Sequence, residues 1–184
     1  MNGIIGGPES GAAELLDHYG ISNDDLGRVK SFGETLVQNW DDIVSSWYDW
    51  LRTHPEFDQF FPDQEMVEHV QKRQLPFWRR YFQGDVDDDY VEQRRHLGGV
   101  HARIGLPLAT YLMGQNQWLE LFSNRLVEAG HAQDTLEKTM RAMTRLLMLD
   151  TSVVVEAYTQ INTETMAEQT RSLMEMSTPV TQIW

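Results

Sequence analysis

The sequence contains no cysteine, which excludes disulfide bonds and thiolate metal sites. Chains without cysteine are typical of a reducing cytosol, so we expect a cytoplasmic protein. No run of about 18 apolar residues occurs, which predicts that the chain does not span a membrane. Residues 1–11 have neither a basic start nor a long apolar stretch, so we expect no signal peptide there.

Positive charge is also scarce, with 15 Lys and Arg against 28 Asp and Glu and a net charge of -13. This balance disfavours binding to nucleic acid or anionic lipid, so proteins or neutral small molecules are the expected partners. An acidic run over 85–89 lacks the alternation and final Glu of a calcium loop, and it is better explained as helix capping.

Motifs of the common enzyme classes are missing too. The sequence has no nucleophile elbow, phosphate loop, dinucleotide fingerprint or HExxH motif, and we therefore expect no enzyme. His96 and His101 are five residues apart and would project about 140° from each other on a helix, which argues against a shared zinc ion.

Helical periodicity fills the chain, and no segment shows the alternation of a strand, which predicts an all-α fold. The expected helices cover about 10–18, 23–39 with Asn23 as N-cap, 41–53, 64–83, 87–103, 107–129 and a last one from 134 to Pro179. Pro76 predicts a kink or break in the fourth of these helices. The last helix is longer than a single domain core requires.

The segment 87–103 carries a histidine on its apolar face. At helical spacing this face holds Tyr90, Leu97, His101 and Ile104, with Val100 beside it. Gly98 and Gly99 have no Cβ, so a flat, bulky group could lie close to the backbone there. Spacing alone leaves two interpretations open for His101, a core residue bonded to a carbonyl or a ligand of a bound group.

Two other predicted helices contribute apolar faces. One holds Val37, Val44, Tyr48 and Leu51, with Trp40 close by, and the other holds Met66, Val70, Phe77 and Tyr81. The Tyr48 phenol could simply bond a nearby carbonyl. His69 lies one step off the second face, which predicts the solvent side.

The pattern Y-x3-RR-x2-G-x-VH-x-RIGL, followed by P-x3-Y, resembles the proximal region of globin-coupled sensors, bacterial haem globins fused to signalling modules. The resemblance implies a globin fold with an extra N-terminal helix, and His101 as axial ligand of the haem iron. Because the chain lacks cysteine, the cofactor would be non-covalent haem b. The resemblance also places further residues around it, namely Val70, Phe77, Leu97, Val100, Ile104 and Tyr111.

The segment WYDWLRTHPEF is similar to the second globin helix of the same family, whose FY-x2-L motif carries a distal tyrosine that donates a hydrogen bond to dioxygen. Tyr48 is the matching residue, although Trp47 replaces the usual phenylalanine. Val70 matches a distal aliphatic residue that is more often leucine. His69, if rotated inward, could take over the role of Tyr48 or cap the iron itself.

The globin resemblance covers residues 20–165, which leaves 1–19 as an extension with a pre-helix and 166–184 as a linker helix with the start of another domain. The run LMEMSTPVTQIW looks like the junction between sensor and STAS domain in RsbR-type stressosome proteins. That likeness implies stressosome STAS proteins and a partner kinase as partners. Apolar positions along 107–129 and from 134 onward outnumber those of one core, which predicts a homodimer.

The sequence thus predicts a haem-based sensor of dioxygen or another diatomic gas, signalling by helix and dimer repacking to a STAS output. Three alternatives stay open. One is a haem-free interaction domain with a globin fold, the second is a sensor for a cyclase or histidine kinase, and the third is a globin that turns over dioxygen with nitric oxide.

Overall fold

A computed structural model describes residues 10–177 of the chain, and every regular element in this part is helical. The elements are α1 (Ala12–His18), α2 (Asn23–Leu36), the 3-10 turn η1 (Val37–Asn39), α3 (Trp40–Leu51), α4 (Phe57–Phe60), α5 (Gln64–Phe82), α6 (Asp88–Arg103), α7 (Leu108–Glu128) and α8 (Gln133–Ser177). The all-α prediction is confirmed.

Local capping explains where several of these helices begin and end. Ser22, not the predicted Asn23, caps α2 and forms a capping box with Asp25. Pro107 precedes α7 as its N-cap. Gly130 ends α7 with a φ of 68°, a left-handed conformation that glycine adopts without strain.

Pro76 lies inside α5, and the helix continues through it. Of the predicted kink or break, the break therefore does not occur. Asp87, in the acidic run, accepts from the backbone N–H of Tyr90 at 2.7 Å and caps α6. None of the helices within residues 10–177 is apolar enough over a sufficient length to cross a membrane.

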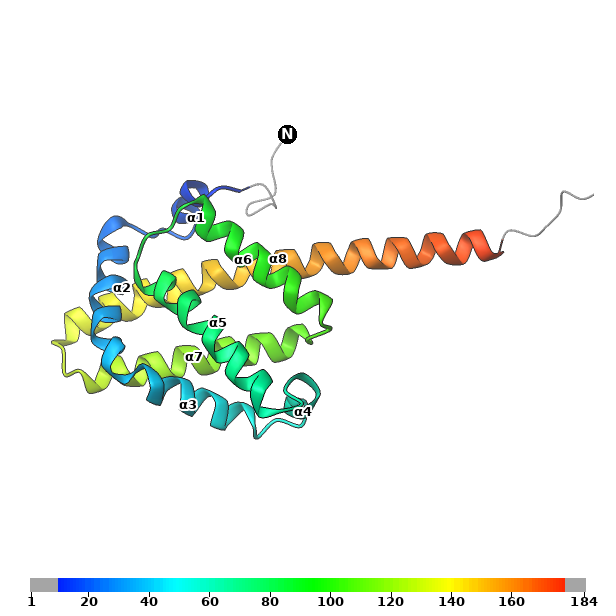
Figure 1. Cartoon of the computed structure of the whole chain (residues 1–184). Helices are drawn as coiled ribbons and strands as arrows, with labels where there is room; N and C mark the ends of the chain where they lie inside the picture. Colours follow the sequence, from blue (N-terminus) through cyan, green and yellow to red (C-terminus); the bar gives the residue numbers. More distant parts are fainter. Residues whose placement is uncertain (1–9, 178–184) are drawn as a thin grey trace, which may run out of the picture.

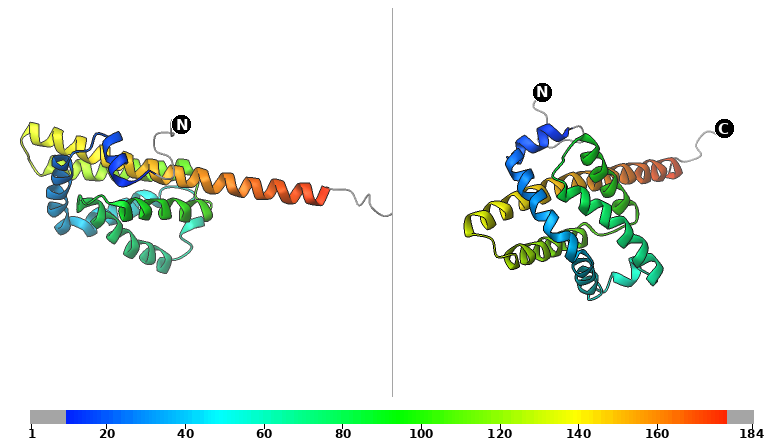
Figure 2. Two further views of the ribbon diagram at one scale, coloured as in Figure 1. Left: turned by 90° about the horizontal axis from the view of Figure 1, so that it is seen from above. Right: turned by 60° about the vertical axis from the view of Figure 1, so that its left-hand side comes forward.

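The long helix α8 organises the molecule. Its first half packs along α6, α7 and α2, and its second half projects from the globular body as a single exposed rod (Figures 1 and 2). Burial along α8 ends at Tyr158, which is 2% exposed. Beyond it the side chains are half-buried or exposed up to Met176, so the tertiary fold supports only the first part of this helix.

Two predicted apolar faces are buried only in part. Val37 is 69% exposed, because the 3-10 turn η1 changes the residue angle before α3 begins. On α5 the buried side chains are Val67, Trp78, Tyr81 and Phe82, while Met66 is 40% exposed. The predicted row through Val70 and Phe77 therefore lies at the edge of the core, half-buried.

Candidate functional site

His101 lies in the last turn of α6, where three helices meet. Its ring centre is 5.5 Å from that of Tyr111 on α7 and 6.4 Å from that of Tyr158 on α8. Tyr111 and Tyr158 form a small buried cluster with Val154, and Leu97 packs against this cluster. The structure thus brings three of the predicted residues together, namely Leu97, His101 and Tyr111.

The imidazole of His101 is neutral at physiological pH. Burial lowers its pKa from 6.5 to about 4, because a low-polarity environment disfavours the charged ring. Its Nδ1 atom is buried and has no hydrogen-bond partner among the described residues. A neutral imidazole keeps a lone pair on one ring nitrogen and can bind a metal through it.

The hydroxyl of Tyr158 is in the same situation as Nδ1 of His101. This hydroxyl is also buried without a partner in the described part of the chain, and burial raises its pKa to about 12. Two orphaned polar atoms in one small cluster are unusual, since buried polar groups are nearly always hydrogen-bonded. The cluster around His101 is therefore incomplete as a protein core.

Tyr48 is on α3 and is fully buried, with ring contacts to Trp47 at 5.0 Å and Phe61 at 5.9 Å. Its hydroxyl donates to Oε1 of Gln74 on α5 over a long 3.3 Å. Burial raises the pKa of the phenol well above its ordinary value, so the hydroxyl keeps its proton. Tyr48 also lines an open pocket of about 410 Å³ between α3 and α5.

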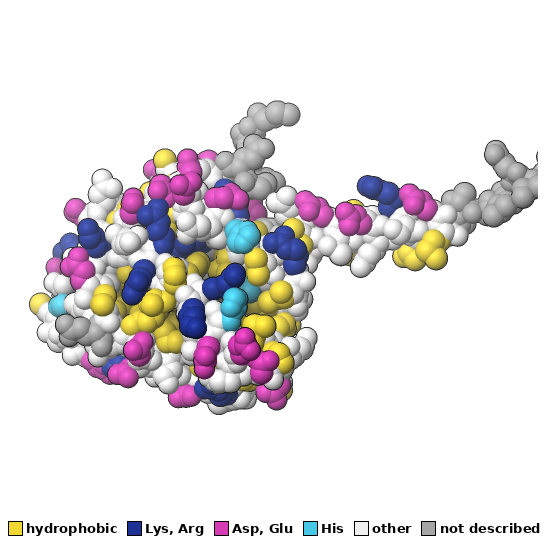
Figure 3. Space-filling view, viewed as in Figure 1, with side chains coloured by type: hydrophobic (Ala, Val, Ile, Leu, Met, Phe, Trp, Pro, Cys, Tyr) yellow, Lys and Arg dark blue, Asp and Glu magenta, His cyan; other side chains and the backbone are white. Residues whose placement is uncertain are grey.

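The other predicted residues are less enclosed. Val70, Phe77, Leu97 and Val100 are half-buried, Ile104 is 54% exposed, and His69 is exposed on α5. The face of the molecule formed by α5 and α6 shows apolar side chains gathered among Lys, Arg and His (Figure 3). No hydrogen bond or ring contact joins the residues around Tyr48 to those around His101 within residues 10–177.

The sequence suggested that a flat group lies against Gly98 and Gly99, but the space beside Gly98 is taken by α8. A Cβ on Gly98 would lie 2.6 Å from the Val154 carbonyl oxygen and 2.8 Å from the Ala157 Cβ, so Gly98 permits the close approach of α6 to α8. Gly99 projects about 160° away from His101. Both glycines serve contacts other than the one predicted for them.

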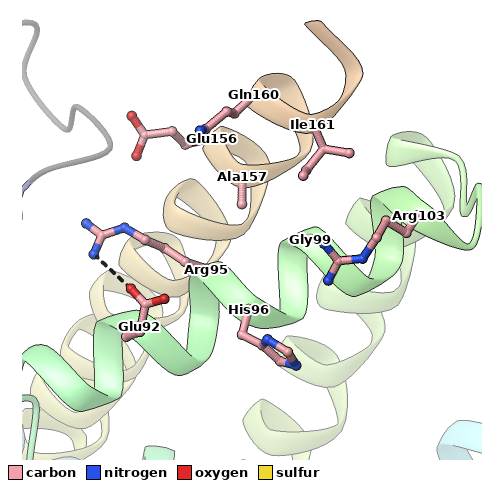
Figure 4. A pocket seen from close by; sticks show the side chains of 9 residues that line it. All are labelled: Glu92, Arg95, His96, Gly99, Arg103, Glu156, Ala157, Gln160 and Ile161. Carbon is pink, nitrogen blue, oxygen red and sulfur yellow. Dashed lines mark ion pairs between the residues drawn. The ribbon is translucent and has the colours of Figure 1, made fainter. Parts of the chain in front are cut away.

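The side of α6 opposite His101 forms a separate pocket of about 240 Å³ against α8. Figure 4 shows the Arg103 guanidinium beside Gly99 on α6, with Ala157 and Ile161 of α8 turned toward that helix. Arg95 in this pocket pairs with Glu92 at 3.7 Å and donates to the Ser10 carbonyl at 2.6 Å.

Sequence reasoning missed a buried ion pair next to the site. Arg94 on α6 is 0% exposed, and its Nε donates to Oδ2 of Asp150 on α8 at 3.0 Å. The Tyr90 hydroxyl donates to both oxygens of the same carboxylate, at 2.7 and 2.9 Å. An arginine among apolar positions and an aspartate on the face of Leu146 and Val154 were the available signals.

These observations fit a haem at the α5–α6 face. His101 supplies a neutral imidazole whose Nδ1 is orphaned, and Tyr48 supplies a buried hydroxyl with only one weak partner. Between them lie apolar side chains that the protein itself covers only in part. Such side chains can gain burial from an apolar macrocycle.

Comparison with known proteins identifies the fold and the family. The sequence profile named Protoglobin matches residues 9–164. The haem-based aerotactic transducer HemAT of Halobacterium salinarum is 23% identical over 96% of this chain. The chain spans 38% of the length of that relative.

Two solved structures share the fold. The globin domain of a Geobacter sulfurreducens globin-coupled sensor has a TM-score of 0.76 at 17% identity, covering 81% of this chain and 98% of that one. The ferric globin domain of E. coli DosC has a TM-score of 0.65 at 12% identity, covering 77% and 97%. Identities this low show the fold alone.

Globins of this family and their sensor relatives bind haem b without a covalent bond, which confirms the cofactor prediction at the level of the family. The names of these relatives describe a haem-based transducer and the globin domain of a sensor. The chain therefore belongs to the protoglobin family, and it shares its fold with the globin domain of a globin-coupled sensor.

Proposed function

We propose that this chain is a haem-based sensor domain for dioxygen or another diatomic gas, and not an enzyme. The observation that carries the proposal is the half-buried His101, whose imidazole is neutral and whose Nδ1 is buried without a partner among the described residues, on a helix whose apolar residues are only partly covered. The names of the relatives, a haem-based transducer and a globin-coupled sensor, support the same function.

His101 binds the haem iron in this proposal. Haem b, when bound, would supply an iron that can bind both an imidazole and a diatomic gas. Tyr111 and Tyr158 confine the imidazole ring, and Leu97, Val100 and Ile104 offer apolar contacts along α6.

Tyr48 would stabilise the bound gas on the side of α3 and α5. Its protonated hydroxyl can exchange the weak bond to Gln74 for one to a partly negative oxygen atom, which is the better acceptor. Val70 and Phe77 of α5 limit the access of water to that side. His69 is exposed and would have to turn inward to compete with Tyr48.

An absorption spectrum of the purified chain, with His101→Ala and His96→Ala variants, tests the proposal. Both histidines are on α6, but His96 is exposed and serves as the matched control. We expect a Soret band in the wild type and in His96→Ala, and loss of most haem in His101→Ala. A colourless wild type would favour the haem-free interaction domain, and full haem in His101→Ala would refute the assigned ligand.

A homodimer is the second part of the proposal. Exposed apolar side chains occur on α7 and α8, namely Leu112, Met113, Val127 and Met148. Burial of apolar side chains is not screened by salt, so a dimer that buries them should persist at high ionic strength. Light scattering at micromolar concentration is the measurement, and a monomer mass would contradict the interface.

For the output we propose an RsbR-like STAS domain, with stressosome STAS proteins and their kinase as partners. This rests on the sequence STPVTQIW, most of which lies outside the described residues. The exposed second half of α8 provides the route from the globin to any such domain. The gene sequence beyond the codon for Trp184 decides between STAS, a cyclase and a histidine kinase.

A further inference from the structure

The α6–α8 seam, by which we mean Arg94, Gly98 and His101 of α6 against Asp150, Val154 and Tyr158 of α8, connects the proposed iron ligand to the projecting helix. Its three contacts follow one another in the same order along both helices. Arg94 pairs with Asp150, Gly98 touches the backbone of Val154, and His101 packs near Tyr158. The two helices therefore point the same way here, and Figure 1 shows α6 crossing α8 obliquely, with the close approach at Gly98.

The first contact of the seam is the most restrictive. Tyr90 and Arg94 lie one turn apart on α6, and both donate to the single carboxylate of Asp150. The Arg94 guanidinium is also held between two rings, 3.6 Å from the centre of Tyr90 and 4.0 Å from that of Phe77 on α5. Sliding α6 by one residue, about 1.5 Å, would break every one of these hydrogen bonds.

Stability alone does not explain a buried ion pair of this kind. Replacing such a pair by apolar side chains is often neutral or stabilising, because two charges have lost their hydration. Arg94 is 0% exposed, and its Nη1 atom has no partner among the described residues. The ion pair instead fixes the position of α6 along α8, because Tyr90 and Arg94 can both donate to the Asp150 carboxylate in one register only.

The position of Arg94 is transmitted to His101. The two residues are seven apart, so they lie on the same side of α6 and about 10 Å from each other along its axis. Gly98 lies between them, and its missing side chain lets the backbones of α6 and α8 approach closely. The seam ends at Tyr158, the point at which α8 leaves the globular body.

We propose, on the basis of the proposed sensor function, that Arg94 and Asp150 are positioning residues that lock the His101 helix to α8. A displacement of His101 on gas binding then moves α8 at its exit from the globin. Without the ion pair, α6 shifts along α8 and the displacement is not passed on. The haem and the gas would still bind, because neither contacts Arg94 in this proposal.

The test uses the double variant Arg94→Met/Asp150→Leu, which removes both charges together and leaves none buried alone. Arg125→Met is the control, because Arg125 belongs to an exposed ion pair with Glu128 on α7. Hydrogen exchange at residues 159–165 is measured in the haem-loaded chains with and without carbon monoxide. We expect a gas-dependent change in the wild type and control, and at least a fivefold smaller change in the double variant.

A second measurement does not depend on the cofactor. In the haem-free chain, the double variant should exchange amides of residues 97–103 at least ten times faster, with residues 112–124 of α7 unchanged. Equal exchange in both chains would overturn the positioning role. Should the double variant fail to fold, Arg94→Lys replaces it, with a single ammonium that cannot reproduce the same geometry, and a full gas response in that variant would overturn the inference.

The outcomes separate the two proposals. A wild-type chain that binds no haem refutes the sensor function and this inference with it. A wild type that binds haem and responds to carbon monoxide, alongside a double variant with an equal response, refutes the inference alone. Lower thermal stability together with a full gas response assigns the pair a structural role only, which also overturns the proposal.

Discussion

The aromatic core and the cluster around His101 differ in how completely their buried polar atoms are hydrogen-bonded. In the core, Trp118 stacks on Trp47 at 5.2 Å, and the Trp47 Nε1–H points at the Gly114 carbonyl at 3.4 Å. The Tyr81 hydroxyl donates to the Met143 carbonyl at 2.6 Å. Around His101, by contrast, two buried polar atoms have no partner in the described residues.

The difference shows where stability and function lie in this fold. A core whose rings interlock and whose polar atoms are bonded resists unfolding without help from a ligand. Buried polar atoms without a partner lower the free energy of unfolding, and such atoms are concentrated at functional sites. Single substitutions should therefore have opposite signs in the two regions when the chain is free of cofactor.

The largest effect should come from Trp118→Ala, which removes a ring that is 2% exposed and contacts Trp40, Trp47, Trp78 and Phe122. Cavities of this kind cost about 3–5 kcal/mol of unfolding free energy. Urea unfolding followed by circular dichroism measures the loss. Val37→Ala, at a side chain 69% exposed, is the control and should lose less than about 1 kcal/mol. Similar losses in both variants would contradict the central role of the aromatic core.

Acid should weaken the fold through His101. Because burial lowers its pKa to about 4 in the folded chain, the unfolded chain, with an ordinary value of 6.5, binds the proton more readily between these pH values. Stability is then unaffected above pH 6.5 and falls as the pH decreases toward 4. At one pKa unit per about 1.4 kcal/mol, we expect a loss of about 2–3 kcal/mol from this group at pH 4.5.

The comparison of haem-free wild type with His101→Leu isolates this contribution from those of the carboxylates. Urea unfolding at pH 7 and at pH 4.5 gives the four free energies required. The wild type should lose about 2–3 kcal/mol more than the variant on acidification. Parallel losses in the two chains would show that the imidazole is hydrated and not buried.

A smaller effect is expected on the side of the site that carries Tyr48. Removing a hydrogen bond to a partly charged acceptor costs about 1.5–3 kcal/mol, so Tyr48→Phe should release dioxygen roughly tenfold faster or more. Stopped-flow dissociation rates of the haem-loaded chain measure it. An unchanged rate in Tyr48→Phe, with a large change in His69→Leu, would transfer the role to the exposed histidine.

The smallest effects give the most direct test of the comparison, because they use the same chemical change in each region. Tyr81→Phe removes a bonded hydroxyl and should destabilise the haem-free chain by about 1 kcal/mol. Tyr158→Phe removes a hydroxyl without a partner and should be neutral or stabilising by up to about 1 kcal/mol. Thermal and urea unfolding give both values, and losses of equal size would erase the distinction.

Much of the fold follows from local sequence. The 3.6-residue period, capping residues such as Asp87 and glycines such as Gly130 predict most of the helices to within a few residues, because these signals act over a single turn. The family resemblance added His101 as the proposed ligand of the haem iron, since the VHxRIGL motif is local as well. Those features need no knowledge of what packs against them.

The rest was decided by tertiary packing. No local pattern shows that Arg94 is fully buried, because its partner Asp150 lies 56 residues away on another helix. Gly98 was assigned to a flat group, yet its missing side chain admits α8, and Ile104 was placed on the buried face, yet it is 54% exposed. Periodicity fixes which side chains share a face of a helix, but the angle at which two helices cross decides which part of that face is covered.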